Sequence, residues 1–146
     1  MNLDYRALAD HWMRRVDEVG LLAAIDEIAA PALIVDSGMG TKDIAALRAR
    51  FEEMAVAFPD ATVTLEDVIV DGPKVCLVLD WQGSHLGPLR GFAPTGRPVK
   101  FAIVMVMLMN GFLVERVRIF SEAFTGPVQM GIIPAFDDLA QNEGPA

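Results

Sequence analysis

The stretch KFAIVMVMLMNGFLVERVRIF, residues 100–120, decides the fold. Asn110-Gly111 separates two apolar runs, and this dipeptide in such a place is a strong signal for a tight β-hairpin. The first run shows no alternation of polar and apolar residues, so we expect a central strand with both faces covered. The second run alternates, which predicts a strand with Val114, Arg116, Arg118 and Phe120 on one face and Glu115, Val117 and Ile119 on the other. Those two arginines face either water or a group that attracts positive charge.

Outward from this hairpin, the period of the apolar residues changes near residue 61. After that point, two more strands are predicted, at 61–72 and 74–85, with Asp71-Gly72 as the turn signal between them. Before it, apolar residues recur at helical spacing. That spacing predicts helices at about 3–18 and 21–29, a brief strand at 33–36, and a third helix from Thr41, its expected N-cap, to about Phe58. The tail from Gly126 is expected to be irregular.

These elements predict an α+β fold in which three N-terminal helices pack on a curved antiparallel sheet of four or more strands. The 146 residues are enough for one domain, 1–146, with its own core. Three helices cover only one face of such a sheet, so the simplest cover for the other face is a second copy of the chain. We therefore expect a homodimer packed through its sheets. The alternative is that the C-terminal tail folds back over that face.

Composition and charge exclude several classes of function. The chain has 53% hydrophobic residues and a net charge of −8, which argues against nucleic acid or an anionic membrane as a partner. Its single cysteine, Cys76, excludes an internal disulfide and fits a reducing compartment. The N-terminus lacks the apolar core of a signal peptide, and the longest apolar run, 101–109, is too short to span a bilayer as a helix. We expect a soluble, cytoplasmic protein.

Four motifs carry a resemblance to a known family. They are Phe58-Pro59-Asp60, the turn Gly83-Ser84-His85-x-Gly87, the segment Gly91-x-x-Pro94-Thr95-Gly96-Arg97, and the hairpin at Asn110-Gly111. With these motifs, residues 5–131 resemble the SnoaL-like polyketide cyclase family of the nuclear-transport-factor-2-like superfamily, and 132–146 form a tail. The resemblance implies a cone-shaped α+β barrel, open at one end, with helices closing a deep and mostly apolar pocket.

The resemblance changes the interpretation of Arg116 and Arg118. Family members often read His-x-Asp at these two positions, with both side chains in the pocket and the aspartate acting as acid/base in ring closure. Arginine stays protonated at any working pH, so Arg118 cannot remove a substrate proton as a carboxylate does. Two pocket arginines would instead bind a carboxylate or stabilise an enolate, and they would need an anionic partner in an apolar cavity.

Further side chains are candidates for the same pocket. Asp36 pairs with an arginine, acts as a base, or is only a turn residue. Glu122 shares the parity of the arginines and either pairs with them or lies at a wet rim. His85 either shuttles protons near the pocket mouth or holds its turn through hydrogen bonds. The candidates for apolar lining, each with core packing as the alternative, are Trp12, Trp81, Phe101, Phe120 and the methionines 105, 107 and 109.

We expect no metal and no cofactor, because no cluster of His, Cys, Asp and Glu has metal-ligand spacing. The first hypothesis is a SnoaL-like enzyme acting on a small hydrophobic molecule that is anionic or enolisable. Asp36 or His85 would move the proton, and Arg118 would stabilise negative charge. Cyclase, isomerase, dehydratase and hydrolase chemistry all stay open. The alternative is a non-catalytic protein that binds a hydrophobic acid in the same pocket.

Overall fold

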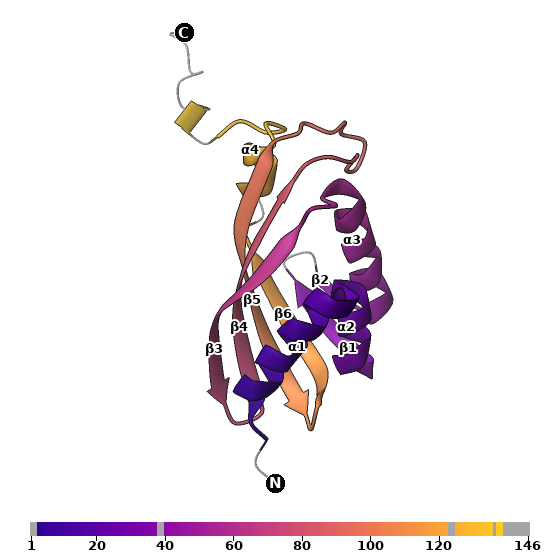
Figure 1. Cartoon of the computed structure of the whole chain (residues 1–146), viewed down its shortest axis with the longest axis vertical. Helices are drawn as coiled ribbons and strands as arrows, with labels where there is room; N and C mark the ends of the chain where they lie inside the picture. The colour runs from indigo at the N-terminus through magenta and orange to yellow at the C-terminus, as the bar shows by residue number, and fades with distance from the viewer. Residues whose placement is uncertain (1–2, 38–39, 123–124, 136, 139–146) are drawn as a thin grey trace.

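The chain forms a curved sheet with helices packed along one side (Figure 1). The computed structural model describes residues 3–37, 40–122, 125–135 and 137–138. The helices are α1 (Tyr5–Val19), α2 (Leu21–Ile28), α3 (Ile44–Ala57) and α4 (Thr125–Gln129). The strands are β1 (Ala29–Ser37), β2 (Gly40–Lys42), β3 (Thr62–Asp71), β4 (Lys74–Ser84), β5 (Pro98–Asn110) and β6 (Leu113–Ser121). In the sheet their order is β2-β1-β6-β5-β4-β3.

The expected α+β fold class is confirmed, and one pairing in the sheet is parallel. From β6 to β3 all neighbours are antiparallel, as the hairpin signals predict. β1 instead runs parallel to β6, with Ile34 opposite Arg116 and Asp36 opposite Arg118. This strand is longer than the four residues expected at 33–36. The tail also holds a short helix, α4, where irregular structure was expected.

Aspartate side chains cap the N-terminal ends of α1 and α3. The carboxylate of Asp4 accepts hydrogen bonds from the N–H groups of Arg6 and Ala7, each at 3.1 Å, and so caps α1. Asp43 caps α3 by accepting from the N–H of Ala46 at 3.0 Å. The expectation that Thr41 is this cap is wrong, because Thr41 pairs within β2, two residues before the helix begins.

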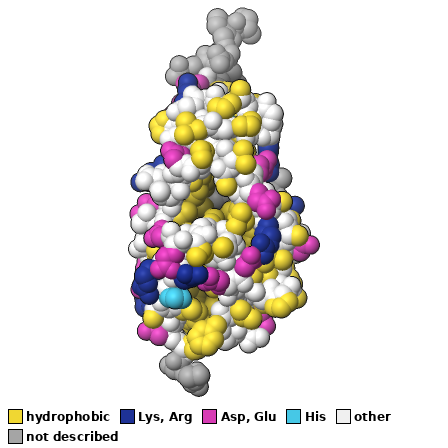
Figure 2. Space-filling view, turned by 45° about the vertical axis from the view of Figure 1, so that its right-hand side comes forward, with side chains coloured by type: hydrophobic (Ala, Val, Ile, Leu, Met, Phe, Trp, Pro, Cys, Tyr) yellow, Lys and Arg dark blue, Asp and Glu magenta, His cyan; other side chains and the backbone are white. Residues whose placement is uncertain are grey.

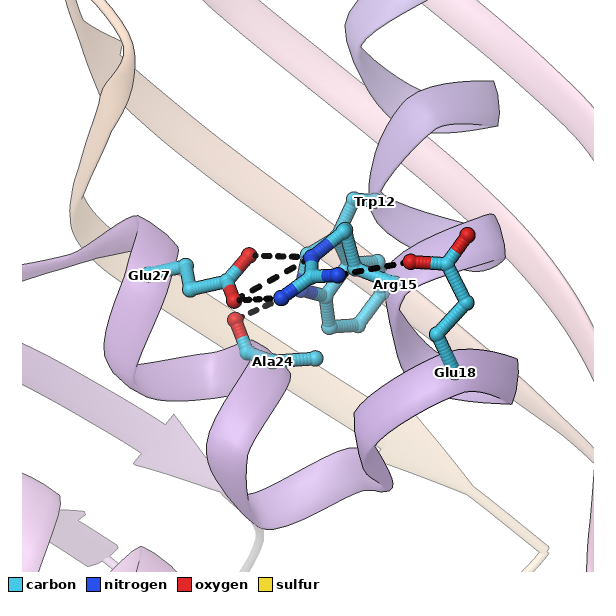
Figure 3. A network of polar contacts seen from close by, with 5 residues as sticks. All are labelled: Trp12, Arg15, Glu18, Ala24 and Glu27. Atoms are coloured by element: carbon cyan, nitrogen blue, oxygen red, sulfur yellow. Dashed lines mark hydrogen bonds and ion pairs between the residues drawn. The ribbon is translucent and has the colours of Figure 1, made fainter.

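Two contacts fix the angle between α1 and α2 (Figure 3). The indole Nε1 of Trp12 donates to the carbonyl oxygen of Ala24 at 3.0 Å. Beside it, the guanidinium of Arg15 lies between Glu27 and Glu18, at 2.7 Å and 2.6 Å. The apolar faces of both helices then pack on the sheet.

The side chains of the long strands alternate between an inner face, toward α1–α3, and an outer face. On β4 the inner residues Val75, Leu77, Leu79 and Trp81 are buried, and the outer residues between them are half-buried. The buried residues form two clusters. The first cluster surrounds Trp12, Leu77 and Val117, and the second cluster surrounds Phe58, Trp81, Val99 and Met130. Val63 and Ile103 pack against both clusters.

A β-bulge in β6 decides which of its side chains face inward. Leu108 pairs with Arg116 and Met109 pairs with Val114, so Glu115 is the extra residue. Val114 therefore lies on the same face as Val117, and both are buried. The expected grouping of Val114 with Arg116 is wrong, because the bulge shifts the alternation by one residue.

The outer face of the sheet is not covered by α1, α2 or α3, which all lie on the other side (Figure 1). Ala102, Val104 and Val106 of β5 point outward and remain half-buried. The expectation that both faces of this strand are covered is therefore met on the inner face only, within the described residues.

Candidate ligand site between the helices and the sheet

Half-buried apolar side chains lie on the inner face between the first and the second cluster. Phe101, Ile103 and Met105 of β5 alternate with the outer residues of that strand, so they point inward, yet each keeps some exposed surface. Figure 2 shows a hollow in the middle of this side of the molecule, with hydrophobic side chains inside it. The side chains that point inward and are half-buried are therefore the candidates for its lining. They are Phe51, Val63, Leu65, Phe101, Ile103, Met105 and Ile119.

An aromatic stack forms one end of this lining. Phe101 stacks on Trp81 with ring centroids 4.7 Å apart, and Phe58 meets Trp81 edge to face at 4.9 Å. Trp81 is buried and Phe101 is half-buried. Phe101 thus has its partner on one side and accessible surface elsewhere, an arrangement that suits contact with a flat apolar molecule.

The inner face of the four long antiparallel strands carries no ionisable side chain. Each described inward position on β3, β4, β5 and β6 is apolar, glycine or serine. These four strands therefore contribute no charged side chain to the lining of the hollow. This arrangement favours a ligand that is itself uncharged, because a buried charge without a partner is costly.

The two arginines lie on the outer face, where the structure differs from the expected pocket position. Arg116 reaches Asp36 at 3.5 Å, and Arg118 lies over the ring of Phe120, 5.3 Å from its centroid. Both arginines and Phe120 are exposed. The physical reason is the alternation of β6, since buried Val117 and half-buried Ile119 take the inner positions. A role for Arg116, Arg118 and Phe120 in ligand binding stays a prediction without support from this geometry.

Asp36 belongs to the same outer group. Besides Arg116, its carboxylate accepts a hydrogen bond from the hydroxyl of Thr41 at 2.9 Å. These contacts fit the alternative in which Asp36 pairs with an arginine. Glu122 directly follows β6 and is exposed, and the carbonyl oxygen of its main chain accepts from the N–H of Thr125 at 3.1 Å.

His85 lies in the turn that directly follows β4. It has no exposed surface, and its Nδ1 accepts from the N–H of Thr95 at 3.2 Å, with the Thr95 hydroxyl at 3.0 Å. Nδ1 is thereby an acceptor, which assigns the proton of the neutral ring to Nε2. Within the described residues, Nε2 is buried and has no hydrogen-bond partner. These hydrogen bonds fit the alternative in which His85 holds its turn, and Nε2 keeps a donor without a partner among the described residues.

Three of the four motifs that carry the resemblance meet around this turn, whereas the hairpin at Asn110-Gly111 lies at the other end of β5. The carboxylate of Asp60 accepts from the N–H of Ser84 at 2.7 Å, and this hydrogen bond, with a second from the Ser84 hydroxyl, lowers the pKa of Asp60. The N–H groups of Leu86 and Gly87 both donate to the carbonyl oxygen of Ala57 at 3.0 Å. These contacts tie the end of α3 to the end of β4.

Trp12 and the deeper methionines are core residues. Trp12, Met107 and Met109 are buried in the first cluster. They line a small apolar cavity of about 20 Å³ between α1 and the sheet. A cavity of this size holds about one water molecule, so it is too small for a ligand.

The described residues contain no group of three or more His, Cys, Asp and Glu side chains that could hold a metal ion. In the same part of the chain, no helix is long and apolar enough to cross a membrane.

Sequence reasoning missed several residues of the hollow. Val63, Leu65, Ile103 and Ile119 were read only as strand residues, and Phe51 only as part of a helix face. These strand residues could have been found from the alternation of side chains along each strand. Every second residue from one known to face inward also faces inward. For Ile119 that count also needs the bulge at Glu115, which the sequence does not mark.

Comparison with known proteins agrees with the motifs. A family model described as SnoaL-like polyketide cyclase matches residues 5–123. No curated protein is significantly similar to the chain.

Solved structures share the fold. AclR, a candidate hydroxylase from Streptomyces galilaeus, has a TM-score of 0.81 at 19% identity, covering 93% of this chain and 86% of its own. IdmH, a candidate polyketide cyclase from Streptomyces antibioticus, has a TM-score of 0.73 at 20% identity, covering 85% and 98%. A SnoaL-like candidate cyclase from Jannaschia sp. CCS1 has a TM-score of 0.74 at 20% identity, covering 88% and 94%. Identities this low establish a shared fold and leave activity open.

Proposed function

Since this chain belongs to the SnoaL-like polyketide cyclase family, we propose that it binds a small, flat, hydrophobic molecule in the hollow between α3 and the inner face of the sheet. The observation that carries the proposal is the half-buried state of Phe101, Ile103 and Met105. These side chains lie between two packed clusters, where a monomer without a ligand site would be expected to close its core. Methionine adapts its shape to different ligands, which suits such a lining.

The proposed ligand is uncharged and carries enolisable ketone or phenol groups, as polyketide-type rings do. Its class follows from the family and from the aromatic pair Trp81 and Phe101. The absence of ionisable side chains from the described inner face of β3–β6 argues for a neutral molecule. The anionic ligand that the two arginines suggested loses its main support, because Arg116 and Arg118 lie on the outer face.

Titration with a matched pair of probes tests this proposal. A neutral hydroxyanthraquinone and an anthraquinone carboxylate present similar rings with different charge. We expect the neutral probe to bind more tightly by calorimetry and to quench tryptophan fluorescence, since Trp81 stacks on Phe101. Stronger binding of the carboxylate, or no binding of either probe, would contradict the proposed ligand class.

Variants locate the bound probe. Ile103→Trp fills the hollow and should weaken binding by about 10-fold or more, the effect of a few lost apolar contacts. Val56→Trp is the matched control, because Val56 is 62% exposed on α3. Arg118→Met should leave binding unchanged. Loss of binding in Arg118→Met with retention in Ile103→Trp would move the site to the outer face.

Acid/base catalysis on the bound molecule is the second candidate function. It is favoured by one observation, the buried Nε2 of His85 without a partner among the described residues. His85 continues the parity of Trp81 on β4, and its ring lies 5.5 Å from that of Phe58. If the protein turns over a bound molecule, His85→Ala should lower the turnover rate more than Asp36→Asn does. Equal turnover in wild type and both variants would mean that neither His85 nor Asp36 is the catalytic group.

A further inference from the structure

Ser121 brings a hydroxyl to the rim of the hollow. After the bulge in β6, the inner positions of that strand are Val117, Ile119 and Ser121. Ser121 lies directly opposite Ile103 of β5, so the two Cβ atoms are about 5 Å apart on one face of the sheet. Ile103 is half-buried and borders the hollow. Ser121 is therefore the direct neighbour of a lining residue, at the end of β6.

This hydroxyl is the only one on the inner face of the four long antiparallel strands, as far as the structure describes them. The other inward positions of β3, β4, β5 and β6 hold apolar residues or glycine. Ser121 is exposed, and its hydroxyl has no hydrogen-bond partner among the described residues. It can therefore contact a molecule in the hollow without the loss of an existing contact in the protein.

Other polar side chains near this face are less well placed. Ser37, on the inner face of β1, donates its hydroxyl to the carbonyl oxygen of Gly40 at 3.3 Å. His85 has no exposed surface. Lys42 belongs to the edge strand β2, which pairs only with β1. Ser121 thus offers the polar group nearest to the half-buried lining of β5.

The aromatic end of the hollow lies diagonally across from this hydroxyl. Phe101 is two positions before Ile103 on β5, so its Cα is about 7–8 Å from that of Ser121. The ring of Phe101 stacks on Trp81 and is half-buried. A ligand that contacts Phe101 and reaches Ser121 has to span this distance, which fits a fused-ring molecule better than a single small group.

Hydrogen bonding determines which end of such a ligand meets Ser121. An oxygen atom of a neutral molecule gives up water when it enters an apolar hollow, and this loss is costly unless a protein group replaces the water. The side chains of Phe101, Ile103 and Met105 offer no such replacement. The oxygen is therefore best accommodated beside Ser121, with the apolar ring against Phe101.

We propose that Ser121 selects and orients the bound molecule, by donating a hydrogen bond to a ketone oxygen or accepting one from a phenol hydroxyl. This inference rests on the proposed function, since it needs a ligand in the hollow. It narrows the ligand class to fused rings that carry an oxygen at the end remote from the aromatic pair Trp81 and Phe101. A hydrocarbon of the same shape would leave the hydroxyl of Ser121 without a partner from the ligand.

Equilibrium dialysis of the full chain with 2-naphthol and with naphthalene tests the selection. The two probes share their fused rings and differ by one hydroxyl. Ser121→Ala should lower the affinity for 2-naphthol by about 5-fold, the effect of one neutral hydrogen bond, and leave the affinity for naphthalene unchanged. Ser121→Thr keeps a hydroxyl and should keep most of the affinity for 2-naphthol. Circular dichroism checks that each variant folds.

Two control variants remove polar groups elsewhere. Thr62→Val removes a hydroxyl from the outer face, where Thr62 lies opposite Gln82. Lys42→Ala removes the cation at the edge of the sheet. Both variants should bind the two probes as wild type does. If either control lowers the affinity for 2-naphthol as much as Ser121→Ala does, the assignment to Ser121 is wrong.

Nuclear Overhauser effects between 2-naphthol and the protein test the orientation. Protons beside the naphthol hydroxyl should be close to the Cβ protons of Ser121, and protons of the remote ring should be close to the ring of Phe101. The reverse pattern, with the hydroxyl end against Phe101, would contradict the proposed orientation.

The outcomes separate this inference from the proposed function. If both probes bind and Ser121→Ala leaves both affinities unchanged, or lowers both by the same factor, the role of Ser121 is overturned and the ligand site stands. If neither probe binds to wild type, both the ligand site and the role of Ser121 are overturned. A loss confined to 2-naphthol, with rescue in Ser121→Thr, supports both.

Discussion

At the scale of single residues, Gly87 shows how closely the family turn approaches α3. A Cβ added to Gly87 would overlap the carbonyl oxygen of Val56 and come within 2.9 Å of its carbonyl carbon. Main-chain atoms cannot move aside as a flexible side chain does. Gly87→Ala should therefore lower the free energy of unfolding by at least about 2 kcal/mol, measured with denaturant.

Gly126→Ala is the matched control for that change. A Cβ at Gly126 meets Val99 at 3.8 Å, an ordinary contact. We expect this variant to keep the stability of wild type or gain slightly, because alanine favours the helix. A loss as large as that of Gly87→Ala would mean that crowding at Val56 is not the cause.

Asp60 links the stability of the same turn to pH. The hydrogen bonds from Ser84 lower the pKa of Asp60 in the folded chain below its value of about 3.9 in unfolded peptides. A depressed folded pKa means that the stabilisation is fully present above the unfolded value and is lost as the pH falls through the folded one. Asp60→Asn should thus be less stable than wild type at neutral pH, and the difference should shrink in acid.

The measurement is the free energy of unfolding of both proteins between neutral pH and the acid limit of folding. Asp10→Asn, on the exposed side of α1, corrects for the removal of one negative charge. A difference between wild type and Asp60→Asn that grows in acid would contradict the assigned direction of the pKa shift.

At the scale of elements, the sequence predicts those helices and hairpins that are marked by residues close together in the chain. Asn110-Gly111 and Asp71-Gly72 mark two hairpins, and helical spacing marks α1, α2 and α3, because each signal lies within a few neighbouring residues. The parallel pairing of β1 with β6 joins residues about 80 positions apart, and no turn signal accompanies it. The bulge at Glu115 also has no signal in the local sequence, because it arises from the register between β6 and β5.

The candidate site is less predictable than the fold for the same reason. Trp81 and Phe101 were named as candidates for apolar lining, and both lie on the inner face. Arg116 and Arg118 were assigned to the pocket through the resemblance, whereas in this chain their positions on β6 face outward. Side-chain direction at a strand depends on every bulge before it, so motif alignment alone does not determine it.

The short helix α4 protects an open strand edge. Beyond Ile103 the strand β5 has lost its partner β6, and the amide oxygen of Gln129 accepts from the N–H of Lys100 at 2.7 Å. The amide nitrogen of Gln129 donates to the carbonyl oxygen of Lys100 at 3.0 Å. Gln129→Ala should lower stability by about 1 kcal/mol and speed hydrogen exchange at the Lys100 amide.

Gln129→Glu separates the two hydrogen bonds. It keeps an acceptor for the N–H of Lys100 and loses the donor to the carbonyl oxygen. We expect an exchange rate at Lys100 between those of wild type and Gln129→Ala. Unchanged exchange in Gln129→Ala would mean that another group protects this edge.

At the scale of the whole molecule, the fold uses the two faces of one sheet differently. The inner face is apolar and covered by helices, with packed clusters at both ends and half-buried side chains between them. The outer face combines an apolar centre with opposite charges at its two sides. The lining of the proposed ligand site and the charged side chains of the outer face therefore lie on opposite sides of one sheet.

Two core truncations test whether the hollow is open in solution. Leu77 has no exposed surface, so Leu77→Ala should lower the free energy of unfolding by about 3–4 kcal/mol, because it leaves a closed cavity. Ile103 is half-buried and borders the hollow, so Ile103→Ala should lose only about 1–2 kcal/mol. Both are measured by denaturant unfolding at one protein concentration, so that association affects them alike. Equal losses would mean that the space beside Ile103 is closed in solution, and the proposed ligand site would then have no room.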